Sequence, residues 1–263
     1  MKFSICLETF FTDSSYLDRI PKLVERGFSR IEFWDHGNKD INAISRLVDR
    51  NVIKVTIFSG HRNGELFTEK GFGIYKEEIM ESVKVARRLK ASGLMILSQG
   101  LNPDGSGIPI PSDNRKEELI LKLFNNLGRL ARIAEKEGIV LYLEPLNSKM
   151  DHPGIFLNNS RFAFMLVNEI NSPNLKVLYD IYHMQIMEGN IINTIKKNIS
   201  SIGYIHVADV PGRHEPGTGE LNYGNILKML KDLDFGGTVG FELFPEGEST
   251  ESLMLINDML LNL

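Results

Sequence analysis

The sequence contains few residues of the kinds that cross-link a chain or hold it in a membrane. Its 263 residues include one cysteine and one tryptophan. A single thiol, Cys6, excludes an internal disulfide framework and any metal site built from several thiolates, so we expect Cys6 to be a core residue of the first strand. No segment approaches the ~18 consecutive apolar residues of a membrane span. Glu8 interrupts the N-terminal apolar residues before they could act as a secretion signal, and we therefore expect a cytoplasmic protein without membrane contact.

Excess positive charge is absent as well. Lysine and arginine number 30 against 34 aspartate and glutamate residues, for a formal net charge of −4. Surfaces that bind nucleic acid are usually basic, so the sequence predicts a small-molecule substrate and no nucleic-acid partner. At this length, a chain buries roughly three quarters of its unfolded surface, which is enough for one large domain or two small ones. A homo-oligomer, dimer or tetramer, remains open.

Eight short apolar segments recur along the chain, and a helical pattern follows each. The segments are mostly unalternating, as expected of parallel strands that are covered on both faces. The predicted strands are Lys2–Leu7, Ser29–Trp34, Ile53–Phe58, Leu94–Ser98, Ile139–Leu143, Lys176–Tyr179, Gly203–Val207 and Thr238–Leu243. The predicted helices include Tyr16–Arg26, Ile41–Asp49, Ile74–Leu89, Arg115–Glu137, Arg161–Ile170 and a last helix after Thr250. Eight such units without a linker predict an α/β fold, a single-domain (β/α)₈ TIM barrel over residues 1–263.

Local signals support this reading. Asp40 is expected to cap the second helix, Ser160 precedes the fifth, and Gly138 ends the fourth. Pro21 should kink the first helix or delay its start, because proline lacks the backbone N–H. An open doubly wound sheet is the alternative, but it would carry a glycine-rich phosphate loop after the first strand, and residues 7–11 have none.

A polar residue ends each of four consecutive predicted strands: Glu144, Asp180, His206 and Glu242. Burying an unpaired charge is costly, and the carboxyl ends of barrel strands meet at one face. We therefore expect these four side chains to share one metal ion. Two Glu, one Asp and one His suit Mn²⁺, Mg²⁺ or Co²⁺ better than a structural zinc. The sequence predicts one divalent ion, with Mn²⁺ favoured.

Further polar residues follow the same strands. A neutral imidazole at His183 and a guanidinium at Arg213 could hold the oxygens of a small polyhydroxylated or carboxylated substrate. Trp34, His61 and Gln99 end the second, third and fourth strands and are predicted to line the substrate side. For Trp34, packing at the rim is an equal alternative.

The longest irregular stretches all follow strands, and in a barrel such loops gather at the catalytic face. His36, His152 and His214 are expected to be surface or loop histidines, with His152 nearer the site because it follows the fifth strand. The stretches are Ser59–Gly73, Gln99–Asn114, Asn147–Asn159 and Asp209–Tyr223.

Several of these segments have a specific pattern. They are Glu144-Pro-Leu-Asn147, Asp180-Ile-Tyr-His-Met-Gln185 with Glu188-Gly189, and the long segment Ala208-Asp-Val-Pro-Gly-Arg-His-Glu-Pro-Gly-Thr-Gly-Glu-Leu-Asn-Tyr223. They resemble the hydroxypyruvate isomerase family, a branch of the xylose isomerase-like TIM barrels. The resemblance extends to residues 10–12 and 27–33 and so covers most of the chain.

The resemblance implies a divalent metal held by Glu144, Asp180, the strand-seven residue and Glu242. It also implies that the two glutamates transfer protons and that His183 and Arg213 bind substrate. His206 departs from the pattern, since hydroxypyruvate isomerases often carry Gln there and the related ketose 3-epimerases carry His.

Such a site predicts chemistry through an enediolate. A metal chelated by a carbonyl oxygen and its neighbouring hydroxyl oxygen acidifies the intervening C–H and stabilises the metal-bound enediolate. One glutamate acting on both carbons gives an isomer, whereas two glutamates on opposite faces give an epimer. The main hypothesis is an isomerase of hydroxypyruvate/tartronate semialdehyde or a short 2-keto sugar acid. A ketose 3-epimerase of the tagatose or psicose type, a dehydratase and a non-catalytic sugar-binding module are the alternatives.

Overall fold

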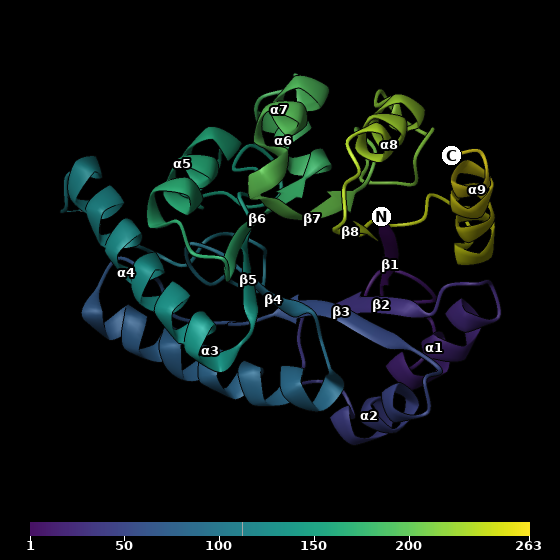
Figure 1. Ribbon diagram of the computed structural model, residues 1–263, viewed down its shortest axis with the longest axis horizontal. Coiled ribbons are helices and arrows are strands. Elements are labelled where there is room, and N and C mark those ends of the chain that lie inside the picture. Colours follow the sequence, from purple (N-terminus) through teal and green to yellow (C-terminus); the bar gives the residue numbers. More distant parts are fainter. Residues whose placement is uncertain (112) are drawn as a thin grey trace.

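The computed structural model describes residues 1–111 and 113–263, and in this part of the chain eight parallel strands close into a barrel. The strands pair in chain order, and β8 closes the barrel against β1 (Figure 1). The strands are β1 Lys2–Cys6, β2 Arg30–Phe33, β3 Lys54–Ser59, β4 Gly93–Ile96, β5 Val140–Leu143, β6 Leu175–Asp180, β7 Ile202–Val207 and β8 Thr238–Phe241. Every predicted strand is present within two residues of its expected ends, which confirms the TIM barrel.

Helices surround the strands (Figure 1). They are α1 Tyr16–Val24, α2 Ile41–Asp49, α3 Glu69–Leu89, α4 Lys116–Glu137, α5 Ser160–Ile170, α6 Ile181–Met187, α7 Ile191–Asn198, the 3₁₀ turn Ile199–Ser201, α8 Tyr223–Asp232 and α9 Ser249–Leu261. Asp40 caps α2 as predicted, and Gly138 ends α4 with a left-handed φ of 66°. Pro21 lies inside α1 without delaying its start at Tyr16.

Four helix starts differ from the prediction. Those of α4 and α9 differ by one or two residues and have no side-chain cap, whereas side-chain caps explain the starts of α3 and α5. The Thr68 hydroxyl caps α3, so this helix begins at Glu69, well before the expected Ile74. Asn159 caps α5, and Ser160 is its first helical residue rather than its cap. An additional helix, α6, follows β6 directly. None of the helices in the described residues is both long and apolar enough to cross a bilayer.

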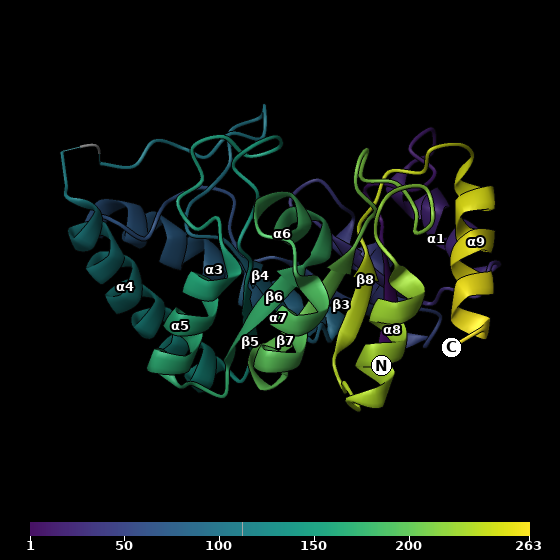
Figure 2. The ribbon, with the colours of Figure 1, turned by 90° about the horizontal axis from the view of Figure 1, so that it is seen from above.

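Side chains fill the interior of the barrel and leave no room there for a substrate. The candidate site is therefore expected at the mouth of the barrel. Apart from the main core, a smaller cluster comes from five adjacent strands: Ile57, Met95, Tyr142, Leu178 and Tyr204. Gly93 and Gly203 on the strands make room for the Tyr142 ring, because an added Cβ would lie 2.5 or 2.6 Å from it. Cys6 is fully buried, as predicted. The loops that follow β4, β5 and β7 lie together on the side where these strands end (Figure 2).

Candidate metal centre and active site

The four strand-end residues converge. One ligand atom from each of Glu144, Asp180, His206 and Glu242 lies within 4.8 Å of the others, and all four residues are buried. His206 Nδ1 is 3.4 Å from both Glu144 Oε1 and Glu242 Oε2 and 3.9 Å from Asp180 Oδ2. The barrel geometry therefore brings together the residues that the sequence singled out.

The donor atoms of this cluster suit a divalent cation. Glu144 Oε1, Asp180 Oδ2 and both ring nitrogens of His206 are buried without a hydrogen-bond partner among the described residues. The other Asp180 oxygen accepts the His183 amide at 3.2 Å and caps α6, so Oδ2 remains free to face the cluster. A buried polar group without a partner costs about 1–3 kcal/mol. An oxygen-rich set with one nitrogen would be satisfied by Mn²⁺ or Mg²⁺.

The cluster also displaces the pKa values of its members. Burial raises the pKa of Glu144 and raises that of Asp180 to about 7. For Glu242, burial acts in the same direction, but the positive charges of Arg213 and His206 outweigh it and lower the pKa. For His206, burial is outweighed by the surrounding carboxylates, and the pKa lies well above its ordinary value. Such displaced pKa values are typical of functional sites.

His183 lies beside this cluster with a fixed tautomer. The Asn147 amide oxygen accepts hydrogen bonds from the Met150 and Asp151 backbone amides, both at 3.0 Å. The Asn147 nitrogen is therefore the donor to His183 Nδ1, at 2.7 Å. Because Nδ1 accepts, the hydrogen of the neutral ring is on Nε2, which lies 3.5 Å from Asp180 Oδ2. Burial and the charge of Arg213 lower the His183 pKa well below its ordinary value, so the ring stays neutral.

Arg213 is the cation of the site. Its Nη2 donates to Glu242 Oε2 and lies 3.6 Å from Asp180 Oδ2, and its guanidinium lies over the Tyr182 ring, 5.1 Å from the centroid. The Nε atom is buried and has no hydrogen-bond partner among the described residues. Arg213 also has a positive φ of 60°, which is uncommon for a non-glycine residue and concentrates at functional sites. The guanidinium therefore has a donor available for a bound anion.

Asp209 holds the loop that carries Arg213. It is fully buried, and its carboxylate accepts four backbone N–H bonds. Oδ1 accepts from Val210 and Leu221 and Oδ2 accepts from Gly217 and Gly219, at 2.9–3.0 Å. This one side chain thus fixes the loop between β7 and α8.

Replacing Asp209 with Asn should destabilise this loop. One carboxylate oxygen would become an NH₂ group facing two N–H donors, and hydrogen bonds to charged groups contribute about 1.5–3 kcal/mol each. We expect the free energy of unfolding to fall by about 3 kcal/mol, measured by urea denaturation. The exposed Asp232→Asn change is the matched control and should leave stability within ~0.5 kcal/mol.

The other predicted substrate contacts have different surroundings. Trp34 Nε1 donates to Glu242 Oε1, and its ring is 37% exposed, packed edge-on against Phe244. His61 Nε2 accepts the Leu97 amide at 3.0 Å, which leaves Nδ1 to donate to a backbone carbonyl. Burial lowers the His61 pKa to about 4. Both residues line the cavity, but the His61 nitrogens are already engaged by the backbone.

Gln99 is fully buried and does not line the cavity. Its amide nitrogen donates to the Ile108 and Gly154 carbonyls, and its oxygen accepts the Phe156 amide at 3.0 Å. All its polar capacity is therefore spent on joining the loops after β4 and β5, and the substrate role predicted for it has no structural support.

A cavity of about 420 Å³ opens above the carboxylates. The residues that line it include Trp34, Glu144, His152, His183, Arg213 and Glu242. His152 packs edge-on against His183, with 5.2 Å between ring centroids, and its Nδ1 donates to the Gly105 carbonyl at 2.8 Å. His36 lies in the loop between β2 and α2, within the prediction of a surface or loop histidine, but it is buried there, with Nε2 3.2 Å from Ser82 Oγ.

The family model for the xylose isomerase-like TIM barrel matches residues 20–259. The chain belongs to this family. Within it, the chain is 31% identical to the hydroxypyruvate isomerase of Escherichia coli (strain K12) over 253 residues, 94% of each chain. It is 28% identical to the 2-oxo-tetronate isomerase of Cupriavidus necator over 256 residues, 96% of each chain.

Several solved structures share the fold over nearly the whole chain. An AP endonuclease, family 2, from Brucella melitensis superposes with a TM-score of 0.87 and 26% identity, over 98% of each chain. The 3-keto-D-glucoside 4-epimerase YcjR from E. coli gives a TM-score of 0.83 and 21% identity over 99% of each chain. An IOLI protein with a bound zinc atom gives 0.79 and 20% over 100% of this chain and 97% of its own.

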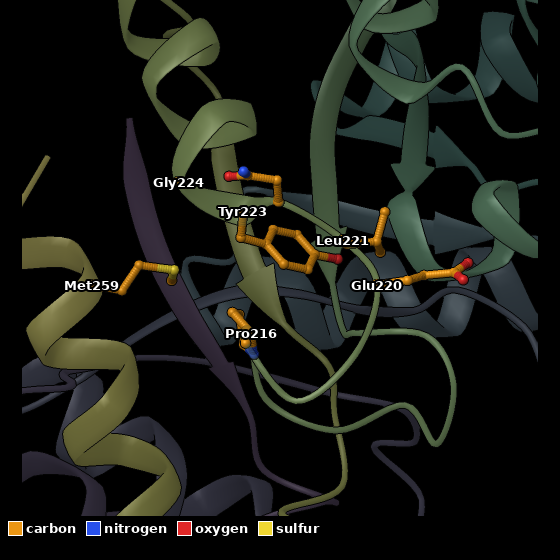
Figure 3. Close-up of a pocket in the computed structure, with 8 residues that line it drawn as sticks. Pro216, Glu220, Leu221, Tyr223, Gly224 and Met259 are labelled. Atoms are coloured by element: carbon orange, nitrogen blue, oxygen red, sulfur yellow. The ribbon is translucent and has the colours of Figure 1, made fainter.

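The protein has a second pocket, which lies outside the mouth of the barrel. It has a volume of about 470 Å³ and lies between the β7–α8 loop and Met259 of α9. Pro216, Glu220 and Tyr223 project around it (Figure 3). Glu144, Asp180 and Glu242 do not line this pocket. The mouth of the barrel therefore remains the candidate site.

Sequence reasoning missed one buried carboxylate of this barrel. Glu32 lies inside β2, is 3% exposed, and its Oε1 is 3.1 Å from His206 Nε2. The signal was present, because Glu32 stands between Ile31 and Phe33 in an apolar strand. A charge at an apolar segment is the same anomaly that singled out Glu144, Asp180, His206 and Glu242.

Proposed function

We propose that the protein is a divalent-metal-dependent isomerase of a small 2-oxo hydroxy acid, such as hydroxypyruvate/tartronate semialdehyde or a short 2-keto sugar acid. The observation that carries the proposal is the convergence of three carboxylates and one imidazole within 4.8 Å, beside a buried guanidinium. Relatives named hydroxypyruvate isomerase and 2-oxo-tetronate isomerase, similar over nearly the whole chain, support it.

Glu144, Asp180, His206 and Glu242 would hold the metal, with Mn²⁺ the preferred ion and Mg²⁺ or Co²⁺ also compatible with these donors. When bound to the carbonyl and hydroxyl oxygens of such a substrate, the ion would make the C–H of the hydroxyl-bearing carbon more acidic. A structure neighbour that carries a zinc atom supports a divalent ion on this fold.

Glu242 is the preferred base. Its pKa is lowered, so it is ionised, and hydrogen bonds from Trp34 and Arg213 hold its two oxygens. In the proposed reaction, Glu242 removes a proton from C3 of hydroxypyruvate to give the enediolate. Returning the proton to C2, while the hydroxyl proton on O3 passes to O2, gives tartronate semialdehyde. Glu144 faces the same region and is the second proton-transfer group.

Arg213 and His183 are proposed to position the substrate. The unpartnered Nε of Arg213 is available to one oxygen of the substrate carboxylate. The Nε2–H of neutral His183 can donate to a substrate oxygen without adding charge. Trp34, and the face of His61, would bound the cavity around the carbon chain.

A ketose 3-epimerase is the second candidate. His206 favours it, as does the presence of two glutamates, Glu144 and Glu242, each 3.4 Å from the same His206 nitrogen. With a glutamate on each face of the enediolate, a proton removed from one face can return to the other.

The two reactions can be separated by ¹H NMR in D₂O with Mn²⁺. We expect hydroxypyruvate to be converted to tartronate semialdehyde with deuterium incorporated at the reacting carbon. Conversion of ketoses such as fructose or tagatose to their C3 epimers, with hydroxypyruvate left unchanged, would favour the epimerase. Release of water to give a deoxy product would identify a dehydratase. No reaction with any member of the panel would contradict catalysis on this substrate class.

Metal binding should also stabilise the fold. An ion that binds only the native state at 100 times its Kd adds about 2.7 kcal/mol, and each kcal/mol shifts Tm by roughly 2–4 °C in a domain of this size. We therefore expect Mn²⁺ to raise the Tm of chelator-treated protein by about 5–10 °C in calorimetry. An Asp180→Ala, Glu144→Ala double variant should show no comparable rise. An equal rise in that variant would locate the ion elsewhere.

A further inference from the structure

Glu32 lies directly beneath the proposed metal centre. Its carboxylate is buried inside the barrel, and Oε1 is 3.1 Å from His206 Nε2. Neither atom has a hydrogen-bond partner among the described residues. We propose that Glu32 is a positioning residue that fixes the tautomer and orientation of His206. This inference rests on the proposed metal-dependent function.

The two ring nitrogens of His206 face different surroundings. Nδ1 is 3.4 Å from an oxygen of Glu144 and of Glu242, whereas Nε2 faces Glu32 alone. An ionised carboxylate can only accept, so it favours the hydrogen of the imidazole on Nε2. The Nδ1 lone pair then points among the other carboxylates, where a ligand to the ion is needed. Carboxylate partners of this kind fix metal-binding histidines and raise their basicity.

Glu32 is itself held in place from below. The Tyr204 hydroxyl donates to Glu32 Oε2. Tyr204 in turn lies 2.9 Å from Thr56 Oγ1, which lies 2.9 Å from Ser4 Oγ. One oxygen of the carboxylate is therefore occupied by this buried network, and the other is left for His206.

The barrel wall leaves room for this carboxylate. Gly240 on β8 is adjacent to it, and a Cβ added at Gly240 would lie 2.6 Å from Glu32 Oε1. Any larger residue at 240 would push the carboxylate away from its present position. Glycine at position 240 therefore leaves the space that the Glu32 carboxylate occupies.

The arrangement defines what position 206 requires. The side chain must donate toward Glu32 and accept toward the ion. Besides His, glutamine meets this requirement, because its NH₂ group donates and its carbonyl oxygen is a ligand. We therefore expect His206→Gln to retain Mn²⁺ binding within about tenfold and His206→Leu to lose more than that.

The direct test measures the Mn²⁺ Kd from the EPR signal of the free ion. Glu32→Met removes the acceptor at similar length, and we expect affinity to fall at least tenfold, within the ~10–100-fold typical of such partners. Glu32→Gln keeps an oxygen that can accept from Nε2, so its loss should be smaller. The same replacement at the exposed Glu220, Glu220→Met, is the matched control and is expected to stay within threefold of wild type.

A second readout does not depend on any change at Glu32. Long-range ¹H–¹⁵N spectra of histidine-labelled protein loaded with Mg²⁺ should show His206 protonated on Nε2, with the resonance assigned from its absence in His206→Gln. Protonation on Nδ1, or a wild-type Kd in Glu32→Met, would overturn the role of Glu32 alone. Failure of the wild-type protein to bind Mn²⁺ at all would instead overturn the proposed metal centre, and this inference with it.

Discussion

Replacing Glu242 or Glu144 with Gln is expected to lower kcat at least ~10²-fold, the low end of what general acid–base catalysis contributes. Glutamine keeps an oxygen that can face the ion but cannot accept the substrate proton. Both carboxylates lie 3.4 Å from His206 Nδ1, so either replacement removes a carboxylate from the cluster in which the proposed proton transfer takes place. The measurement is the steady-state rate with hydroxypyruvate, at Mn²⁺ concentrations that saturate each variant.

The same substitution elsewhere on the chain provides the control. Glu220 is exposed on the β7–α8 loop, and its carboxylate accepts from the Gln185 side chain. Glu220→Gln should therefore leave kcat unchanged. A Glu242 or Glu144 variant that still binds Mn²⁺ and turns over at nearly the wild-type rate would remove that residue from the mechanism.

The strand-end pattern predicted that Glu144, Asp180, His206 and Glu242 lie together, because barrel geometry leaves little freedom at those positions. Consecutive parallel strands end at one face, so Glu144 and Asp180 on adjacent strands must lie close together. The number of residues between Glu144 and Asp180 in the sequence does not affect how close they lie in the barrel. The ends of all eight strands followed from the same apolar segments.

Strand-end position was a weaker guide for side chains whose direction is set by local hydrogen bonds. Gln99 and His61 follow strands just as Glu144 does, but backbone groups of neighbouring loops occupy their polar atoms. These loop contacts join residues far apart in sequence, and no periodicity encodes them. Glu32 carries the same sequence signal, a charge inside an apolar run, but it lies within β2 rather than at a strand end, and only the fold shows its contact with His206.

The placement of Arg213 depends on the loop rather than on a strand. Four backbone N–H groups converge on Asp209 and hold the loop, and Arg213 adopts a positive φ within it. The glycine- and proline-rich segment indicated a shaped loop. The four hydrogen bonds that Asp209 accepts cannot be read from the sequence, because the most distant partner, Leu221, lies twelve residues away and approaches Asp209 only in the folded loop.

Arg213→Lys is expected to lower kcat/KM for hydroxypyruvate about 10²-fold, because a bidentate charge-assisted contact contributes about 1.5–3 kcal/mol per hydrogen bond. In the present structure, all the polar contacts of Arg213 with Glu242 and Asp180 use Nη2. A lysine ammonium could replace that donor, so Glu242 would keep a cationic partner. Lysine has no atom equivalent to the buried, unpartnered Nε of Arg213. The pair of N–H donors with which a guanidinium holds both oxygens of a carboxylate is therefore lost.

A neutral ketose responds differently, because Arg213 can only donate to its hydroxyl groups. For fructose or tagatose we expect the same substitution to reduce kcat/KM less than about tenfold, the effect of one neutral hydrogen bond. The wild-type enzyme should prefer the acid, and Arg161→Lys on the outer helix α5 should change neither value. If wild type instead prefers the neutral sugars and Arg213→Lys affects both substrate classes equally, then Arg213 does not select a carboxylate. In that case His206, which favours an epimerase, is the better guide to the substrate.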